Sequence, residues 1–422
     1  MGRMDELLVI GGGIGGLVTA LSLHAIGEPV RVFESALDIR ALGVGINLLP
    51  HAVRELDALG LLEVLATEAV APTTLSYFSK HGSLIWSEPR GLAAGYAWPQ
   101  LSIHRGALQT ALLAAAVERI GADRVHTGHH LSRVEQHGGE VIAMFEDRRS
   151  GGDATVTGGA LIGADGIHSV VRRSLAADEG PPKWNGALLW RGIVDHPPLF
   201  DGRTMVWAGH PSQKFISYPI VDLGDGNQRC NFIAELRTSG TALAEREDWN
   251  RPGVLDDYLP AFSRWSFPWL DVAAFIRRAP GTFVFPMVDR DPLERWSDGR
   301  VTLLGDAAHP MYPIGSNGAS QAILDARVLA ACVRDHGDVV EAFERYEAVR
   351  RPATSAIVLA NRGLGPELPM QLVEERAPNG FADVADVISP EEIVTVTEGY
   401  RRTAGFALAA LDDHTSLADR SY

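Results

Sequence analysis

The sequence predicts an α/β fold, in which a helix-covered parallel sheet is interrupted by a second, sheet-based domain and followed by C-terminal helices. Three observations support this prediction. A glycine-rich turn follows a short apolar run at the N-terminus, and strand-turn-helix patterns recur near residues 163 and 305. Between residues 183 and 283 the composition changes to tryptophan, proline and short alternating runs. With 422 residues, 46% of them hydrophobic, the chain is long enough for two packed domains.

Charge and cysteine content limit the class of protein. The net charge is −15, from 38 basic and 53 acidic side chains, which argues against a general binder of nucleic acids or anionic membranes. Cys230 and Cys332 cannot form a disulfide framework, so we expect two buried thiols in a cytoplasmic protein. No apolar run approaches the ~20 residues of a membrane span. The chain enters its first apolar run at residue 7, so no signal peptide is expected.

The N-terminal stretch carries a dinucleotide-binding fingerprint. The apolar run 7–10 leads directly into a G-x-G-x-x-G turn formed by Gly11, Gly13 and Gly16, and a helix and a second strand are predicted after it. Gly11 permits the tight turn, Gly13 lets the backbone approach a pyrophosphate, and Gly16 lets the helix pack close to the strand. The strand ends at Glu34, an acid that can accept hydrogen bonds from an adenosine ribose. This pattern predicts a Rossmann-like site for FAD or NAD; the alternative is a turn used only for packing.

Several elements are predicted before residue 123. A second glycine-rich loop at 43–47 comes before a helix at 50–59, and two strands at 73–90 are joined by a His-Gly turn. The pattern at 100–119 predicts a helix with Arg105 in its first turn, where a cation opposes the helix dipole. We therefore interpret Arg105 as a ligand for phosphate or ribose, with a surface arginine as the alternative. For the glycine-rich loop, the alternative is an ordinary loop before a helix.

The next stretch contains a second acidic turn. Residues 123–157 alternate in the manner of a β-meander. The buried strand 161–162 then ends in a Gly-Ala-Asp-Gly turn at 163–166, and Ser169 is placed to cap the helix that starts at Val170. This turn resembles the fingerprint but lacks its spacing. A nicotinamide nucleotide would therefore have no dinucleotide domain of its own.

The segment 183–285 is predicted to be a sheet domain inserted into the first domain. Strand-like runs occur at 214–221 and 229–236. Tryptophans concentrate in this segment, at Trp184, Trp190, Trp207, Trp249, Trp265 and Trp269. An aromatic-rich sheet suits covering an apolar ligand, although a plain core role is the alternative for each single ring.

The stretch 301–326 combines a strand, an acidic turn, a loop rich in proline and glycine, and a helix start. Asp306 follows the strand, and the helix begins near Asn317 or Gly318. Glycine lets such a loop lie against a flat ring, and a helix N-terminus aims N–H groups and a partial positive charge at its ligand. Our hypothesis is that a flavin ring binds there. His309 is a candidate general base, but its position favours a role in bracing the loop.

The C-terminal part is predicted to be helical. Residues 339–364 form a helix pair interrupted at Pro352, residues 366–389 are irregular, and residues 390–411 form an amphipathic helix before a polar tail. The histidines and cysteines show no metal-ligand spacing, and no nucleophile motif occurs, so no metal site is expected.

Together, the fingerprint with Glu34, the turn at 163–166 and the Gly305–Asp306 turn with its loop resemble the single-component FAD-dependent aromatic hydroxylases, the para-hydroxybenzoate and salicylate hydroxylase group. The resemblance covers residues 5 to about 360. Within this group the chain looks like the phenazine-modifying monooxygenases of pyocyanin biosynthesis. That narrower likeness rests on residues 42–47, 86–91, 102–106, 190–192 and 286–293.

The resemblance implies a Rossmann-like FAD-binding domain of the para-hydroxybenzoate hydroxylase type, an inserted β-sheet substrate domain and C-terminal helices. The FAD-binding domain would comprise residues 1–72, 96–182 and 284–365, and the substrate domain residues 73–95 and 183–283. Residues 366–422 would form the C-terminal helical segment.

The resemblance also implies which residues contact the cofactor. The glycine turn and Glu34 hold the ADP half of FAD, the turns at 163–166 and 305–306 contact the pyrophosphate and ribityl region, and two loops line the isoalloxazine. The implied cofactor contacts are Gly11, Gly13, Ile14, Gly16, Glu34, Gly45, Ile46, Arg105, Asp165, Gly166, Asp306, Pro313, Gly315, Gly318 and Ala319. The candidate substrate contacts are Leu48, Arg191, Trp207, Tyr218, Tyr312 and Pro313. Arg191 could meet a substrate carboxylate or belong to a structural ion pair.

The implied activity is hydroxylation of an electron-rich aromatic substrate with O2, electrons from NADH or NADPH, and a flavin C4a-hydroperoxide. The cofactor performs the oxygen transfer, so no residue is assigned as catalytic; the protein positions the ring and excludes water. The expected partners are O2, NAD(P)H and a phenazine, phenol or aromatic carboxylate, and the chain would be a monomer or homodimer. Two alternatives are a flavin-binding protein without turnover and a nicotinamide-only dehydrogenase.

Overall fold

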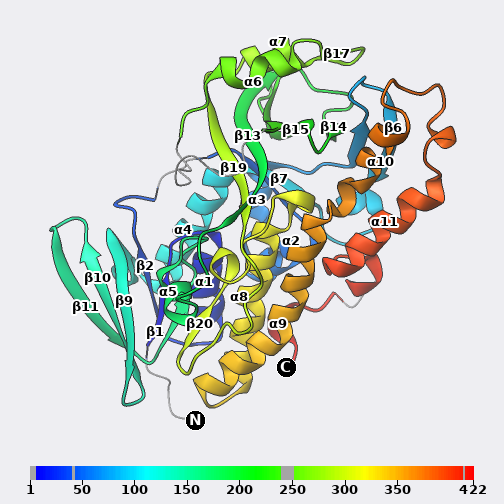
Figure 1. The fold of residues 1–422 in the computed structure, drawn as a ribbon. Helices are drawn as coiled ribbons and strands as arrows, with labels where there is room; N and C mark the ends of the chain where they lie inside the picture. The colour runs from blue at the N-terminus through cyan, green and yellow to red at the C-terminus, as the bar shows by residue number, and fades with distance from the viewer. Residues whose placement is uncertain (1–5, 40–42, 239–250, 412–413) are drawn as a thin grey trace.

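The computed structural model describes residues 6–39, 43–238, 251–411 and 414–422. Figure 1 shows a parallel sheet with packed helices near the N-terminus, a curved antiparallel sheet above it, and C-terminal helices along one side. Residues 40–42, which precede the second glycine-rich loop, and Trp249 of the inserted domain lie outside the described residues.

The first sheet has five parallel strands in the order β20-β12-β1-β2-β8. These strands are β1 Leu7–Ile10, β2 Val30–Glu34, β8 Val125–Thr127, β12 Ala160–Gly163 and β20 Val301–Leu303. Every residue of β1, β12 and β20 is buried, as expected for apolar runs covered on both faces. The helices α1 (Ile14–Ala25) and α8 (Gly318–Asp335) contribute to the same hydrophobic core. The predicted α/β class is confirmed.

A three-stranded antiparallel sheet extends from this domain at the lower left of Figure 1. It consists of β9 (His129–His137), β10 (Glu140–Asp147) and β11 (Gly152–Gly158), which confirms the predicted meander from residue 129 onward. The prediction was wrong at its start, because residues 125–127 form β8 and pair with β2 in the parallel sheet. The ring of Phe145 on β10 stacks on Phe33 of β2, with ring centroids 4.8 Å apart. This contact joins the meander to the parallel sheet.

The inserted domain is a seven-stranded sheet in the order β19-β13-β16-β15-β14-β5-β6. Its strands are β5 Thr74–Phe78, β6 Leu84–Pro89, β13 Lys183–His196, β14 Thr204–His210, β15 Gln213–Asp222, β16 Gln228–Arg237 and β19 Thr282–Asp289. The edge strand β19 pairs antiparallel with β13. Residues 284–289, grouped with the first domain in the sequence, are therefore hydrogen-bonded within the second sheet.

Different elements pack against the two faces of this sheet. Helices α6 (Leu255–Phe262) and α7 (Val272–Arg277), with the short strands β17 and β18 (Ser266–Phe267 and Leu270–Asp271), pack over one face. On the opposite face, Tyr218 of β15 shares a hydrophobic cluster with Tyr312, from the loop after β20, and with residues of the C-terminal segment. The second face therefore meets the stretch that was predicted to hold a flavin.

One predicted helix starts later than expected. Residues 101–104 form the strand β7 (Leu101–His104), which pairs with β3 (Gly45–Leu48) and β4 (Ala69–Val70), and α4 spans Arg105–Ile120. The prediction of a helix over 100–119 was therefore wrong at its start, because pairing with β3 outweighs the helical pattern. The intervening helices are α2 (Pro50–Ala58) and α3 (Leu62–Thr67).

The predicted break at Pro352 is absent, because α9 runs without interruption from Val339 to Arg362. Proline removes one backbone hydrogen bond from the helix. Buried side chains lie on both sides of it, including Tyr346 and Ile357. We attribute the continuity to this packing, which offsets the lost bond.

The remaining C-terminal predictions need two corrections. Residues 366–389 are not irregular throughout, because α10 spans Leu368–Arg376, and the last long helix, α11, spans Pro390–Thr403 and ends before residue 411. Nor are the final residues a free polar tail. Ser416 is buried, and its hydroxyl donates a 2.5 Å hydrogen bond to Glu55. A sequence pattern cannot show this contact, since its partner lies 361 positions earlier.

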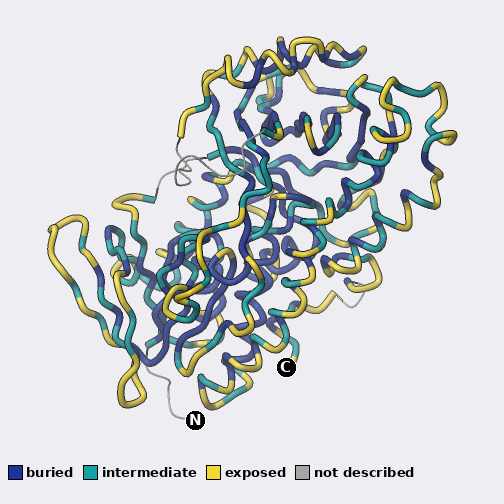
Figure 2. Tube along the Cα trace, viewed as in Figure 1, coloured by how far each residue is buried: buried dark blue, intermediate teal, exposed yellow. Residues whose placement is uncertain are grey.

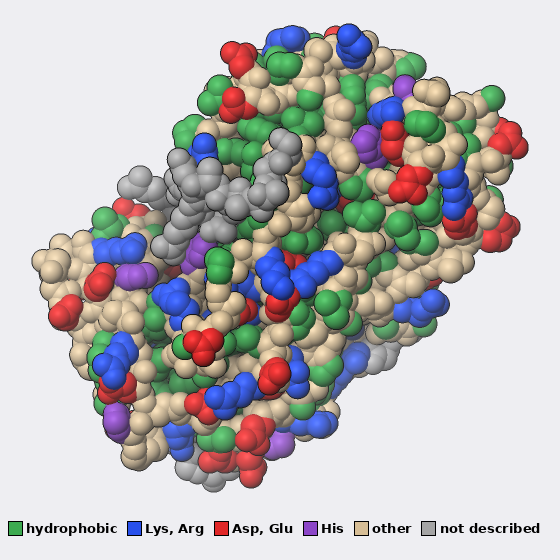
Figure 3. All heavy atoms as spheres, in the orientation of Figure 1, with side chains coloured by type: hydrophobic (Ala, Val, Ile, Leu, Met, Phe, Trp, Pro, Cys, Tyr) green, Lys and Arg blue, Asp and Glu red, His purple; other side chains and the backbone are tan. Residues whose placement is uncertain are grey.

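Buried residues concentrate in the parallel sheet and along the strands of the inserted sheet, whereas the tip of the meander is exposed and the outer helices alternate between buried and exposed residues (Figure 2). Acidic and basic side chains are interspersed on the face drawn in Figure 3. No helix among the described residues is long and apolar enough to cross a membrane.

Candidate active site

The glycines of the N-terminal turn have different surroundings. A Cβ atom on Gly11 would lie 2.3 Å from the carbonyl oxygen of Ala164, and one on Gly16 would lie 1.9 Å from the carbonyl oxygen of Gly11. A Cβ atom on Gly13 would meet no atom within 4 Å. Gly11 and Gly16 therefore permit close packing, while Gly13 borders open space at the start of α1. No side chain caps α1, so its first N–H groups are available to an anion.

Glu34 lies beside this turn at the end of β2. One oxygen of its carboxylate accepts a 2.7 Å hydrogen bond from the Gly12 amide, and the other accepts one of 2.7 Å from the Ala36 amide. The side chain is partly exposed. It is thus oriented by the backbone and retains lone pairs for a ribose hydroxyl.

Asp165 has an additional role that the sequence did not indicate. Its carboxylate accepts hydrogen bonds from the Ser169 hydroxyl at 2.5 Å and the Val170 amide at 2.7 Å, and thereby helps to cap α5 (Val170–Leu175). Burial raises the pKa of Asp165, and these hydrogen bonds oppose the rise. The neighbouring Gly166 has a φ of +77° and borders open space. The turn therefore offers its glycine backbone to a ligand.

Arg172 joins this turn to the one at Asp306. Its guanidinium is buried and donates to the carbonyl oxygens of Ala307 and Ala308, at 3.0 and 2.7 Å. The Asp306 side chain is exposed, yet desolvation raises the pKa of its carboxyl, against the opposing charges of His309 and Arg105. From this combination of accessible surface and strong desolvation we infer that Asp306 lines a groove.

The loop 313–319 continues the same wall. Pro313 is exposed, Gly318 borders open space, and no side chain caps α8, whose first turn begins at Gly318. The helix therefore presents free N–H groups and its positive end at the position that the sequence predicted.

A buried network of hydrogen-bonded side chains packs against this loop on its protein side. His309 binds Asp325 through Nε2 at 2.5 Å, and Arg350 binds the other carboxylate oxygen of Asp325 at 2.7 Å. Burial opposes ionisation, but His309 and Arg350 lower the pKa of Asp325 to about 2. Arg350 also donates to Gln321 at 2.6 Å. This position supports the bracing role for His309 over that of a general base.

These features fit FAD. Two open glycine backbones, two uncapped helix starts and the exposed acid Asp306 lie in turns that pack against one another, since Gly11 approaches Ala164 and Gly15 approaches Leu304 and Ala322. They match a ligand with a phosphate-bearing middle and a flat ring at one end. Arg105 is exposed at the start of α4 and near Asp306, where it can meet the anionic part.

On the side of the inserted sheet, three side chains converge on Gly45. Its amide donates to Asn231 Oδ1 at 2.8 Å, and its carbonyl oxygen accepts from Arg191 and from the Tyr218 hydroxyl, both at 2.7 Å. A Cβ atom on Gly45 would lie 2.6 Å from Asn231. Both backbone groups of Gly45 therefore bind protein side chains. The half-buried Ile46 next to it keeps accessible surface.

Arg191 forms no ion pair with a carboxylate among the described residues. It contacts the carbonyl oxygen of Gly45, the Tyr218 hydroxyl and the ring of Phe285, whose centroid lies 5.7 Å from the guanidinium carbon. Its buried Nε has no hydrogen-bond partner. Burial lowers the pKa of Arg191, and the nearby Tyr218 opposes this shift. The structural ion pair considered from the sequence is therefore not formed in this part of the chain.

The other candidate substrate residues separate into two groups. Trp207, Tyr218 and Tyr312 lie in one hydrophobic cluster on the inner face of the inserted sheet. Leu48 instead lies fully buried in the core of the first domain. The structure therefore brings three of these residues together beside the exposed Pro313 and places Leu48 apart from them.

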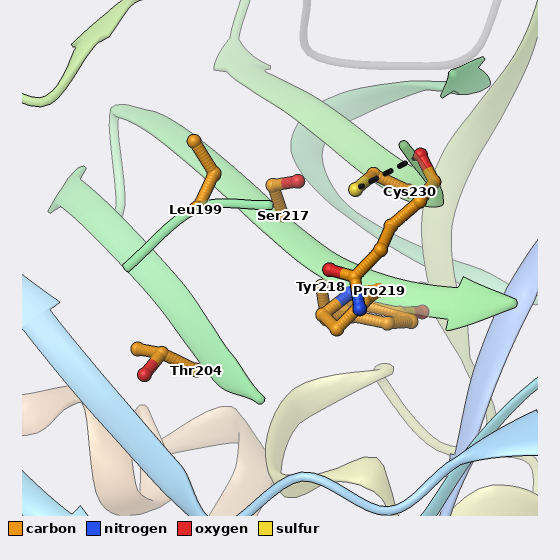
Figure 4. A pocket seen from close by; sticks show the side chains of 7 residues that line it. Leu199, Thr204, Ser217, Tyr218, Pro219 and Cys230 are labelled. Atoms are coloured by element: carbon orange, nitrogen blue, oxygen red, sulfur yellow. Dashed lines mark hydrogen bonds between the residues drawn. The ribbon is translucent and has the colours of Figure 1, made fainter. Parts of the chain in front are cut away.

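Figure 4 shows a small hollow on the opposite face of the inserted sheet. Its lining consists of Leu199, Thr204, Ser217, Tyr218, Pro219, Gln228 and Cys230. It has no room for a water molecule, so we do not regard it as a ligand site. Cys230 and Cys332 are both buried, as predicted.

Several residues of this site carry no signal in the sequence. Asn231 was part of a predicted strand, Arg172 of a predicted helix, and Arg350 of a longer helical pattern. None of them belongs to a motif. Only Asp325, at the end of the stretch that opens with Gly305, lies close enough in sequence to have been suspected.

Comparisons with known proteins agree with this geometry. The family described as FAD binding domain matches residues 4–252 and 282–360. The chain is 44% identical over 402 residues to phenazine 1,6-dicarboxylic acid hydroxylase PhzS of Lysobacter antibioticus, covering 94% of this chain and 96% of that protein. It is 31% identical to 3-hydroxybenzoate 6-hydroxylase of Klebsiella oxytoca, covering 90% and 92%. The fold matches Klebsiella pneumoniae HpxO complexed with FAD and uric acid with a TM-score of 0.75, at 24% identity and 96% coverage of each chain.

These two relatives are hydroxylases. Their activity favours aromatic hydroxylation over the two alternatives, a nicotinamide-only dehydrogenase and a flavin-binding protein without turnover. The match to the family covers well over half of the chain. The chain therefore belongs to the FAD-binding domain family, as an FAD-dependent aromatic hydroxylase.

Proposed function

We propose that this flavin-dependent hydroxylase acts on a flat, fused-ring aromatic carboxylate of the phenazine class, and that Arg191 binds the carboxylate. The observation that carries the proposal is the guanidinium of Arg191, whose contacts with described residues on the inner face of the inserted sheet are all with neutral groups. A cation among protein atoms without a counterion is costly, and an anionic ligand would offset that cost.

The surroundings of Arg191 suit a flat apolar ring. The inner face of the sheet is lined by Trp207, Tyr218 and other apolar side chains, and Phe285 stands beside the guanidinium. Such a surface binds an aromatic ring by burial of apolar area, while one charged group fixes its orientation. The Lysobacter relative is named for a phenazine dicarboxylic acid, which supports the fused-ring class.

The roles of the protein are binding, orientation and exclusion of water. Bound FAD would supply the oxygen chemistry, with electrons from NAD(P)H and oxygen from O2. We propose that the glycine turn and Glu34 hold its ADP half, that Asp306 binds a ribityl hydroxyl, and that the loop 313–319 contacts the ring. The N-terminus of α8 would stabilise negative charge on the reduced ring through backbone N–H groups.

The broader organisation follows from the same proposal. We infer that the parallel sheet binds the cofactor, that the seven-stranded sheet binds substrate, and that α10 and α11 close the site from the C-terminal side. We also infer a cytoplasmic enzyme, in keeping with two buried thiols, and a monomer or homodimer.

A panel of ligands tests the proposal. Purified protein should retain FAD, and its NAD(P)H oxidation should accelerate most with phenazine carboxylates, less with hydroxybenzoates, and least with the same rings lacking a carboxylate. Hydrogen peroxide and hydroxylated product should be measured together, since only coupled turnover yields product. Protein that never retains FAD would contradict the whole proposal. A preference for hydroxybenzoates, as in the name of the Klebsiella oxytoca relative, would contradict only the fused-ring class.

A further inference from the structure

The loop from Tyr312 to Asn317 has a backbone that needs outside support. Gly315 has a φ of +69°, and Ser316, which is not a glycine, has a φ of +60°. The left-handed conformation is unfavourable for a non-glycine residue, so it persists only where the surroundings fix it. The loop lies between the groove on one side and buried side chains on the other. The support therefore comes from the buried side chains on the side of the loop away from the groove.

Tyr400, on the C-terminal helix α11, provides much of that support. Its hydroxyl lies 3.1 Å from the carbonyl oxygen of Ile314 and 2.7 Å from Asn361 Oδ1, and it accepts a 2.8 Å hydrogen bond from Asn317 Nδ2. The side chain is 5% exposed. One hydroxyl thus connects two points of the loop to a neighbouring helix.

The ring of Tyr400 fits between two left-handed glycines. A Cβ atom on Gly315 would lie 2.3 Å from the Tyr400 hydroxyl, and one on Gly365 would lie 2.8 Å from its ring. Gly315 was expected to contact the cofactor, because glycines let the backbone of this loop lie against a flat ring. In the structure the close neighbour of its α-carbon is Tyr400, so the need for glycine arises on the protein side of the loop.

Asn361 and Asn317 extend the support to both ends of the loop. Asn361 Nδ2 donates to the carbonyl oxygen of Tyr312 at 3.0 Å, and Asn317 Nδ2 also donates to the carbonyl oxygen of Gly315 at 3.1 Å. Both asparagines are 1% exposed. The bonds of Tyr400 and the bond from Asn361 to Tyr312 are buried, so losing one of them would leave a buried polar group unpaired.

We propose that Tyr400 is a positioning residue for the flavin, through which the C-terminal helix α11 sets the conformation of the loop 313–319. The inference rests on the proposal that this loop holds the flavin ring. Tyr400 does not touch the groove itself; it acts through Ile314, Gly315 and Asn317, which directly precede the first turn of α8. A change in that loop moves the N–H groups that face the ring, and thereby alters both the affinity for FAD and its reduction potential.

The test compares Tyr400→Phe with Tyr96→Phe. The first variant keeps the ring and removes the hydroxyl from the loop. The second is a matched control, because the Tyr96 hydroxyl donates a 2.5 Å hydrogen bond to the Phe406 carbonyl, near the end of α11, without contacting the loop. Each protein is compared with wild type by FAD titration, by the visible spectrum of the bound flavin and by its midpoint potential.

We expect Tyr400→Phe to raise the Kd for FAD about tenfold, which corresponds to about 1.4 kcal/mol, and to shift the spectrum and the potential. Tyr96→Phe should resemble wild type in all three measurements. Unchanged affinity, spectrum and potential in Tyr400→Phe would overturn the inference, as would equal shifts in both variants, which would indicate a general effect of loosening the C-terminal segment.

A second variant decides the question if Tyr400→Phe does not fold. Asn361→Leu removes the amide that binds the Tyr312 carbonyl and the Tyr400 hydroxyl, and is expected to change affinity and potential in the same direction. A folded Asn361→Leu protein with wild-type values would overturn the inference. Wild-type protein that binds no FAD would instead contradict the proposed function.

Discussion

Arg191 donates a 2.7 Å hydrogen bond to the carbonyl oxygen of Gly45, which joins the inserted sheet to the glycine-rich loop of the first domain. The bond spans 146 positions of the sequence and links β13 of the inserted sheet to β3 of the first domain, at the place where cofactor and substrate were expected to meet. Since the partner is a neutral carbonyl, the positive charge of Arg191 remains available to a ligand.

This relationship leads to a prediction for Arg191→Met. A charged hydrogen bond contributes about 1.5–3 kcal/mol, so kcat/KM for a carboxylated aromatic substrate should fall roughly 10- to 150-fold. The same ring without the carboxylate should be affected much less. Steady-state kinetics on the two substrates gives the ratio directly. Arg229→Met is a suitable control, because Arg229 pairs with Asp195 at an exposed position. Equal losses on both substrates would show that Arg191 does not bind the carboxylate.

Two glycine substitutions in the N-terminal turn are expected to have different effects, one on stability and the other on FAD binding. Gly16→Ala should lower the free energy of unfolding by about 3 kcal/mol, because its Cβ atom would lie 1.9 Å from the Gly11 carbonyl oxygen. Gly13→Ala should leave stability close to wild type but weaken FAD binding about tenfold, since its methyl group enters the space proposed for the pyrophosphate. Thermal melts of the apoprotein and FAD titrations separate the two effects. Normal FAD affinity in Gly13→Ala would argue against a pyrophosphate there.

Asp306→Ala should weaken FAD retention severely, by tenfold or about 1.4 kcal/mol at least. The carboxylate is exposed on the groove and is the acid proposed to bind a ribityl hydroxyl. Asp306→Asn keeps an acceptor oxygen at the same place and should lose less. The flavin content of protein purified in parallel provides the measurement. Full occupancy with normal turnover in Asp306→Ala would remove this assignment.

His51 predicts a specific pH dependence of stability. Burial, with the nearby charges of Arg54 and Arg350, lowers the pKa of His51 to about 3 from 6.5. Between these values the unfolded chain binds a proton that the folded protein does not, so the free energy of unfolding falls as the pH falls below 6.5. At pH 4.5 the contribution is about 2.7 kcal/mol.

Urea denaturation at pH 7.5 and 4.5 measures this effect. His51→Asn should lose less stability than wild type between the two values, by about the amount that His51 contributes. Comparing the two proteins cancels the other titrating groups, provided that the variant keeps the fold. If the free energies of unfolding of wild type and His51→Asn differ by the same amount at pH 7.5 and at pH 4.5, the lowered pKa of His51 is contradicted.

Local chemistry explains which elements the sequence predicted correctly. The glycine turn, the parallel strands, the meander and the start of α8 depend on neighbouring residues: apolar runs, glycines and a capping serine. The errors occurred where distant contacts decide the outcome. Residues 101–104 form a strand because β3 lies beside them, and α9 continues through Pro352 between buried flanking turns.

The amino-acid sequence by itself determined the family, the cofactor and the three turns proposed to bind it, because each of those turns is a short motif whose conformation is encoded within a few residues. Only the tertiary structure decided that Arg191 meets no carboxylate among the residues that the structure describes, that Gly45 is held by Asn231 and Tyr218, and that Tyr400 supports the loop 313–319. The physical reason is that burial and hydrogen bonding between residues tens to hundreds of positions apart exist only once the two sheets and the C-terminal helix have packed together.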